Sequence, residues 1–266
     1  MRIDMETQES TLHNELKHKS IFLRDYATEL FASGATTIRI EKNLGRIAKQ
    51  WHTKADFSVL PTCIVMNLWD ENEEKSYTVT GKIPADRINF NTVSELSGLS
   101  WKIVEDGLGI QEARDRFKEI TEKKRLNSWL VLVLVGLANA SFCGIFGGDP
   151  ISMAIVCFAT MSGFFLKQRL PAKGLDYRIV IILASCLSAI IASSGFVYGW
   201  GKTPEVALAT SVLYLVPGIP FCNAVCDLIY GHYICCISRF LHAVIITVCL
   251  SLGLCIAFKL LNIQFL

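Results

Sequence analysis

The sequence predicts an α-helical membrane protein with five transmembrane helices, preceded by a small cytoplasmic α/β domain. Residues 1–125 carry 19 Lys and Arg and 20 Asp and Glu, whereas residues 126–266 carry only 7 and 4. The second part also contains apolar runs close to the roughly 20 residues that span a bilayer. We therefore expect a polar N-terminal tail (1–20), an α/β domain (21–125) and a transmembrane bundle (126–266).

The first domain shows helical and strand patterns in alternation. Apolar residues recur at helical spacing in 21–32 and 36–51, and Gly34 separates the two segments. The stretch 57–69 is rich in β-branched and apolar residues, which favours a strand. We expect a hairpin partner at 76–80, a short third strand at 88–90, and helices at 93–108 and 111–124.

The second domain contains five apolar segments. The fourth is interrupted by Pro217, Gly218 and Pro220, and the stretch 223–238 behind it is moderately apolar but contains Asp227 and His232. We interpret 223–238 as a loop, an interfacial segment or a re-entrant piece. The expected spans are 128–146, 151–166, 179–200, 206–221 and 240–258.

Basic residues beside the spans predict the orientation, because cytoplasmic loops carry an excess of Lys and Arg. The basic residues lie before the first span, between the second and third spans, and before the fifth. With five spans, these three segments are on the same side of the membrane. The N-terminal domain is then cytoplasmic, and the C-terminus lies outside the cell membrane, or in the periplasm of a Gram-negative cell whose inner membrane it spans. The residues concerned are Lys123, Lys124, Arg125, Lys167, Arg169, Lys173, Arg178 and Arg239.

The broken fourth segment indicates a transporter. Pro217 removes a helical hydrogen bond, and with Gly218 it favours an unwound backbone. Unwound backbone at membrane depth occurs only where protein buries it or a water-filled cavity is lined by it. Such a break beside a polar residue is typical of a substrate site, so we expect a substrate or ion pathway here.

Three polar residues follow this break. An intramembrane carboxylate is costly unless it is functional, so Asp227 is a candidate for proton coupling or cation pairing. The alternatives are a salt bridge to Arg239 or a place on the cytoplasmic surface. Asn223 could bind a carboxylate or amino group of a substrate, or cap a helix. Pro217 and Gly218 could form a hinge or only a packing kink.

Three further residues are candidates for the pathway. Asn139 lies inside the first span, where it could face the pathway or bond a neighbouring helix. Asp149 follows two glycines at a span boundary and could cap the second span, where the helix dipole favours an anion. His242 lies well inside the fifth span, and imidazole titrates near neutral pH, although a hydrogen bond within the bundle is the simpler interpretation.

No motif predicts an enzyme. The sequence contains no phosphate-binding loop and no nucleophile elbow. We expect no cofactor and no metal, because Cys222, Cys226, His232 and Cys235 do not match a zinc-site spacing. Cysteines of the apolar half are expected to be small packing residues. No basic patch interleaved with aromatics indicates nucleic acid binding.

Several motifs resemble those of the threonine/serine exporter family in its split-subunit form. In the first half they are the run Ala32–Glu41, Leu60-Pro61-Thr62, and the Gly-Ile-Gln-Glu-Ala run that ends at Ala113. In the second half they are Phe142–Gly148 with Asp149, and a pattern extending from Val216. That pattern comprises Val216, Pro217, Gly218, Asn223, Ala224, Asp227, Leu228, Gly231 and Arg239.

The resemblance implies a role and a partner. Full-length family members have about ten spans after a cytoplasmic domain, so a five-span chain is similar to the larger subunit of the split form. The implied partner is a small separate membrane protein, and a homo-oligomer in the lipid bilayer is also open. The implied activity is ion-gradient-driven export of threonine, serine or a dicarboxylate such as succinate. A membrane-anchored sensor or assembly protein and a channel are the alternatives.

Overall fold

The computed structural model describes residues 2–84, 88–123 and 126–262. Lys124 and Arg125, used above to predict the orientation, lie outside this set. The chain forms two compact units. Met1–Lys124 and Ile219–Phe240 form the first, here called the α/β unit. Arg125–Gly218 and Leu241–Leu266 form the second, here called the helical unit.

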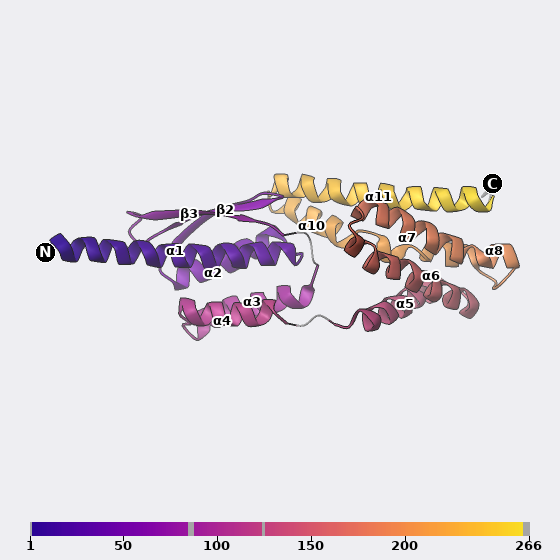
Figure 1. Cartoon of the computed structure of the whole chain (residues 1–266), viewed down its shortest axis with the longest axis horizontal. Coiled ribbons are helices and arrows are strands. Elements are labelled where there is room, and N and C mark those ends of the chain that lie inside the picture. The colour runs from indigo at the N-terminus through magenta and orange to yellow at the C-terminus, as the bar shows by residue number, and fades with distance from the viewer. Residues whose placement is uncertain (1, 85–87, 124–125, 263–266) are drawn as a thin grey trace. The chain divides into compact units, whose positions relative to one another are not determined.

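The α/β unit contains a three-stranded antiparallel sheet in the order β1-β2-β3, flanked by helices (Figure 1). Its central strand alternates strictly, with Ile64, Met66 and Leu68 fully buried. The sheet register pairs Phe57 with Met66 and Met66 with Val79. The elements are α1 (Arg2–Ala32), α2 (Thr37–Gln50), β1 (Lys54–Val59), β2 (Cys63–Trp69), β3 (Ser76–Lys82), α3 (Phe90–Glu105) and α4 (Ile110–Thr121).

Helix α1 packs directly on the sheet and supplies the centre of the core. It lies so close to β3 that a Cβ atom on Gly81 would be 2.6 Å from Arg24 Cγ. Tyr26 is fully buried and donates a 2.6 Å hydrogen bond to the carbonyl oxygen of Leu96 in α3. Burial raises the pKa of Tyr26 well above its usual range, so the phenol remains a hydrogen-bond donor. This bond ties α1 to α3.

The observed elements of this unit differ from the expected ones in three places. Residues 2–20, expected as a polar tail, are helical, with good helix formers and an i,i+4 pair between Glu15 and Lys19 at 2.7 Å. The expected strand 57–69 is two strands, interrupted at residues 60–62 around Pro61, which cannot donate to a ladder. The short strand expected at 88–90 is absent, because the side chain of Asn89 caps α3 instead.

The apolar second half of the chain accounts for the expected spans. Among the described residues, four helical stretches are long and apolar enough to cross a membrane, and a bent pair forms a fifth candidate. The pair, Pro204–Leu215 and Gly218–Ile229, is bent by 61° at the predicted Pro-Gly break. The elements are α5 (Ser128–Ile145), α6 (Pro150–Arg169), η1 (Pro171–Lys173), α7 (Tyr177–Ala192), α8 (Ser194–Tyr198), α9 (Pro204–Thr210), η2 (Leu213–Leu215), α10 (Gly218–Ile229) and α11 (Tyr233–Leu261).

Residues 219–240 belong to the α/β unit, although the sequence pattern groups them with the transmembrane bundle. Most of the stretch 223–238, expected as a loop, interfacial segment or re-entrant piece, is helical and forms the end of α10 and the start of α11. The turn between these helices contains Gly231, whose φ of +81° suits glycine. The polar side chains of this stretch bind the segment where α1 ends and α2 begins.

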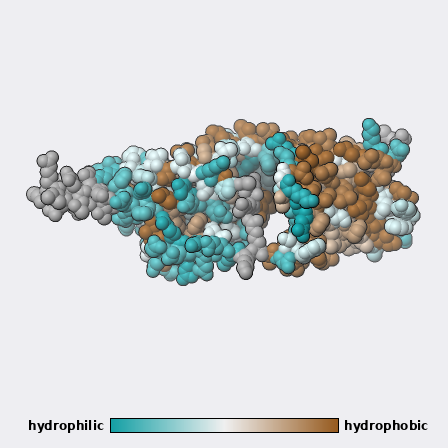
Figure 2. Space-filling view, in the orientation of Figure 1, coloured by the Kyte–Doolittle hydropathy of each residue, from teal (hydrophilic) through white to brown (hydrophobic). Residues whose placement is uncertain are grey.

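On the face shown in Figure 2, the helical unit is mostly apolar, whereas the α/β unit is mostly hydrophilic. The helical unit keeps large side chains exposed, as expected where lipid replaces water. Its interior is instead closed by small residues that let helices approach each other. The exposed side chains include Leu130, Leu134, Leu137, Phe158, Leu183, Val248 and Leu252.

Gly253 is one of these small residues, and we predict that alanine at this position destabilises the helical unit. An added Cβ would meet Ser185 Oγ and lie 2.5 Å from the carbonyl oxygen of Ile182. Overpacking of this kind costs about 1–3 kcal/mol. Thermal unfolding in detergent should show a lowered midpoint for Gly253→Ala.

The control is Gly45→Ala on the exposed side of α2. No atom lies within 4 Å of the added Cβ there. Alanine should be neutral or stabilising, by up to about 1 kcal/mol, because it favours a helix interior. Equal midpoints for wild type and Gly253→Ala would contradict the close packing of α7 and α11.

Candidate functional site

A cluster of polar groups in the α/β unit joins the two motif regions. Asn223 Nδ2 donates to Gly34 O at 2.9 Å, and Arg239 Nη2 donates to Ala35 O at 2.8 Å. The backbone nitrogen of Thr37 donates to Asp227 Oδ1 at 3.1 Å. We call these six residues the polar junction: Gly34, Ala35, Thr37, Asn223, Asp227 and Arg239.

The junction forms where α1 ends and α2 begins. Gly34 has a φ of +93°, the left-handed conformation that commonly ends a helix. The backbone beyond α1 presents carbonyl oxygens, which Asn223 and Arg239 satisfy as donors. The first N–H groups of α2 lack intrahelical partners, and the side chain of its N-cap residue, Thr36, makes no capping bond. The carboxylate of Asp227 takes that place.

The negative charge of the junction lies where a helix end favours it. Asp227 lies at the N-terminus of α2, where the helix dipole favours an anion. Its Oδ2 atom lies 3.1 Å from Arg239 Nη1, in an ionic contact whose angle is outside hydrogen-bond geometry. Asp227 is fully buried, and the Arg239 side chain is only 12 % exposed. The Arg239 guanidinium also lies over the ring of Phe31, 4.5 Å from its centroid.

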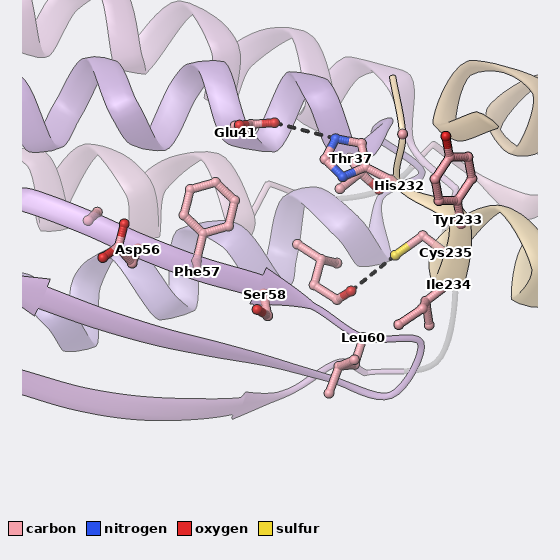
Figure 3. A pocket seen from close by; sticks show the side chains of 13 residues that line it. Thr37, Glu41, Asp56, Phe57, Ser58, Leu60, His232, Tyr233, Ile234 and Cys235 are labelled. Atoms are coloured by element: carbon pink, nitrogen blue, oxygen red, sulfur yellow. Dashed lines mark hydrogen bonds and ion pairs between the residues drawn. The ribbon is translucent and has the colours of Figure 1, made fainter. Parts of the chain in front are cut away.

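The turn between α10 and α11 and the start of α11 make a second set of contacts, of which those of the His232 and Cys235 side chains are drawn in Figure 3. The backbone nitrogen of His232 donates to Asp227 O at 2.8 Å. His232 Nε2 lies 3.4 Å from Glu41 Oε2 on α2. Cys235 Sγ donates to the carbonyl oxygen of Val59 at 3.2 Å. The turn is therefore held to both α2 and the end of β1.

The predicted pathway residues fall into separate places. Asn223, Asp227 and Arg239 come together in the junction, and Asp227 pairs with Arg239, one of the alternatives left open by the sequence. Pro217 lies at the bend between η2 and α10, and Gly218 begins α10. His242 lies on α11 with an exposed side chain, in the helical unit. Sequence reasoning missed Gly34, Ala35 and Thr37 as partners, although they lie in the run Ala32–Glu41 singled out as a motif.

Asn139 lies in an uncharged polar cluster of the helical unit. It is 3 % exposed, and its Nδ2 donates to Thr160 Oγ1 at 2.6 Å and to Thr210 O at 3.0 Å. Ser188 Oγ on α7 donates to the carbonyl oxygen of Ala159 on α6 at 3.1 Å and lies 2.9 Å from Tyr214 Oη on η2. Asn139 thus bonds neighbouring helices with neutral groups.

Asp149 caps α6 and organises the loop before α9. Its carboxylate accepts bonds from Ile151 N, Ser152 Oγ and Thr203 Oγ1, the last two at 2.5 and 2.8 Å. It also accepts from the backbone nitrogen of Lys202 at 3.2 Å. These donors, first among them the Ser152 hydroxyl, hold the pKa of Asp149 well below its usual range.

No group of three or more His, Cys, Asp or Glu side chains could hold a metal ion within the described part of the chain. Cys222, Cys226 and Cys235 are free cysteines, and Cys235 bonds a backbone carbonyl.

In the part of the chain that the structure describes, an α/β unit is joined to four or five helices that are long and apolar enough to cross a membrane, which defines a multi-pass membrane protein. The profile of the family described as "Putative threonine/serine exporter" (ThrE) matches residues 22–261, and the chain belongs to this family. This confirms the resemblance inferred from the motifs. No solved structure matches the chain.

Curated relatives extend the comparison. The chain is 26% identical to "Probable succinate transporter subunit YjjP" of Klebsiella aerogenes, over 90% of this chain and 92% of that protein. It is 27% identical to the protein of the same name in Escherichia coli K12, over 92% of both chains. It is also 22% identical to "Pheromone-regulated membrane protein 10" of Yarrowia lipolytica, over 90% of this chain but only 20% of that protein.

We predict that the Asp227–Arg239 pair stabilises the α/β unit. Asp227→Asn or Arg239→Met leaves one buried charge without its partner, which costs about 3–5 kcal/mol. The double variant should lose less than the sum of the two, because the residues are coupled. The measurement is the unfolding free energy of the purified chain in detergent, in a double-mutant cycle.

The control for this cycle is Asp25→Asn. Asp25 pairs with Arg24 at 2.7 Å, but its side chain is 45 % exposed. Losing such a surface pair costs at most about 1 kcal/mol. Single variants at Asp227 and Arg239 that are no more harmful than this control would contradict the structural importance of the pair.

We also predict that Asp149→Asn destabilises the protein in a pH-dependent way. Because the folded state lowers the pKa of Asp149, its contribution to stability is complete above the ordinary aspartate pKa of about 4. The contribution is lost as the pH falls through the lower folded value. The midpoint difference between wild type and variant should therefore be constant near neutral pH and shrink below about pH 4. A difference that grows on acidification would contradict this cap.

Proposed function

We propose that the chain is the larger subunit of a secondary exporter of small polar metabolites in the cell inner membrane. The family match over residues 22–261 carries this proposal, because it includes both the α/β unit and the helical unit. The word "subunit" in the names of the relatives supports a small separate membrane protein as partner. We propose threonine, serine or a dicarboxylate such as succinate as the substrate, and an ion gradient as the driving force.

We propose that the α/β unit lies in the cytoplasm and the C-terminus outside. Lys167, Arg169, Lys173 and Arg178 support this orientation, because they lie between the second and third spans. With five spans, that loop and the N-terminal unit are on the same side of the membrane.

The bent fourth segment supports alternating access in the proposed exporter. Discontinuous helices at the substrate site are common in secondary transporters. Here the break lies between η2 and α10, and the bend is 61°. We propose that the hinge is the Pro217-Gly218 pair, and that the neutral cluster around Asn139 lines the substrate pathway.

The polar junction suggests a mechanical role for Asp227 and Arg239. In this structure Asp227 is bonded to Thr37 and paired with Arg239, so both carboxylate oxygens are engaged within the α/β unit. We propose that the junction fixes the second half of the bent segment to the cytoplasmic unit. If Asp227 released Arg239 and bound a proton or another cation during transport, the junction would take part in ion coupling.

Efflux from loaded cells tests the proposal. Labelled threonine, serine and succinate would be followed with this chain alone, with a candidate small partner alone, and with both. Export only with both proteins supports a split transporter, and the substrate that moves identifies its class. Export by this chain alone would show that no separate partner is needed and would favour a homo-oligomer. No export in any combination, with both proteins confirmed in the membrane, would contradict the exporter and favour a sensor or assembly protein.

We predict that Gly218→Ala slows export several-fold without unfolding the chain. An added Cβ has open space around it, so a purely structural glycine should tolerate alanine here. Alanine restricts the backbone more than glycine, so a hinge should move less readily. The measurement is the initial efflux rate, normalised to the amount of membrane protein. Gly45→Ala is the control, and equal rates for both variants and the wild type would argue against a hinge at Gly218.

A further inference from the structure

The α/β unit contains a groove that the exporter proposal does not use. It has a volume of about 500 Å³ and is bounded by α2, β1 and the turn between α10 and α11 (Figure 3). Thr37 and Glu41, residues 55–60 and residues 231–235 line it. This volume lies within the range of small-molecule sites, which is about 300–1,000 Å³.

The charge of the groove favours a cation. Its lining includes the carboxylates of Glu41 and Asp56 but no lysine or arginine. His232 is the basic side chain of the lining, and it already faces Glu41. A cleft lined by one sign of charge attracts ligands of the opposite sign. An anionic metabolite is therefore disfavoured here.

Independent evidence for a ligand comes from polar atoms without partners. The side-chain oxygen of Thr37 is buried and makes no hydrogen bond of good geometry, and Thr37 as a whole is only 1% exposed. The Cys235 thiol, a weak hydrogen-bonding group, lies beside it. His232 Nε2 is also buried and lacks a hydrogen bond. An unsatisfied buried group costs about 1–3 kcal/mol, so a ligand that bonds it would gain affinity.

The arrangement of these groups specifies the ligand further. Thr37 and Glu41 are four residues apart on α2, so their side chains lie on the same face of the helix. Phe57 extends from β1 into the space on that side and offers an apolar surface (Figure 3). A hydroxyl oxygen and a carboxylate both accept hydrogen bonds, and an ammonium group has three donors.

We propose that this groove binds a small molecule carrying a protonated primary amine. The ammonium group donates to Thr37 Oγ1 and to the Glu41 carboxylate, and the carbon chain lies against Phe57. The shared chemistry fits both a free amino acid and an aliphatic diamine. All lining residues belong to the α/β unit, so binding can be measured without transport.

Calorimetric titration of the full-length chain in detergent tests the site, in a buffer that contains no amine. The probes are 1,4-diaminobutane, threonine and succinate. Binding of the diamine, with or without threonine, supports ammonium recognition. Binding of threonine alone supports the site and shows that the site also recognises the carboxylate of the ligand. Failure of all amines to bind the folded chain would overturn the proposal, as would binding of succinate alone.

Variants identify where the amine binds. Glu41→Gln and Thr37→Val should each weaken binding at least about tenfold, a loss of about 1.4 kcal/mol. Thr37→Ser retains the hydroxyl and should restore affinity. Glu74→Gln, an exposed acid outside the groove, should leave it unchanged. Amine binding that survives Glu41→Gln and Thr37→Val would belong elsewhere and would overturn this assignment.

Discussion

The buried contact between Asp227 and Arg239 is the interaction on which the α10–α11 region depends. Two charges removed from water are stable only when further bonds satisfy them. Here the N-terminus of α2 supplies a donor to Asp227, and the backbone after α1 supplies an acceptor to Arg239. The turn between α1 and α2 thus presents a backbone carbonyl oxygen and a backbone N–H group a few residues apart. Arg239 binds the carbonyl oxygen, and Asp227 binds the N–H group.

This arrangement changes the interpretation of Asp227. A carboxylate beside a helix break in an apolar sequence suggests an ion site at membrane depth. In the folded chain its neighbours are Thr37 and Arg239, both within the α/β unit. A lone buried carboxylate is costly because its charge lacks partners, and here Thr37 and Arg239 supply them. Asp227 is therefore better explained as a structural anion that holds α10 than as an isolated carboxylate within the bundle.

Local patterns in the sequence predicted most elements but few contacts. Apolar length identified the spans, and Pro217-Gly218 marked the bend, because both are properties of consecutive residues. The meeting of Asn223 with Gly34 joins residues 189 positions apart, and no periodicity records such a contact. The helix in residues 2–20 was missed because its charged side chains suggested a tail. Likewise, Pro61 within 57–69 was given too little weight as an interruption of a strand.

The two later connections between the units differ in stiffness. One passes through Pro217 and Gly218, where the helix is interrupted. The other lies within α11, which continues without interruption from Tyr233 to Leu261. Arg239 is on the α/β side of this second connection, and Gly253 packs against α7 on the other. A continuous helix transmits displacement along its axis, whereas a broken segment absorbs it. The polar junction is therefore connected to the helical unit by one continuous helix and by one interrupted segment.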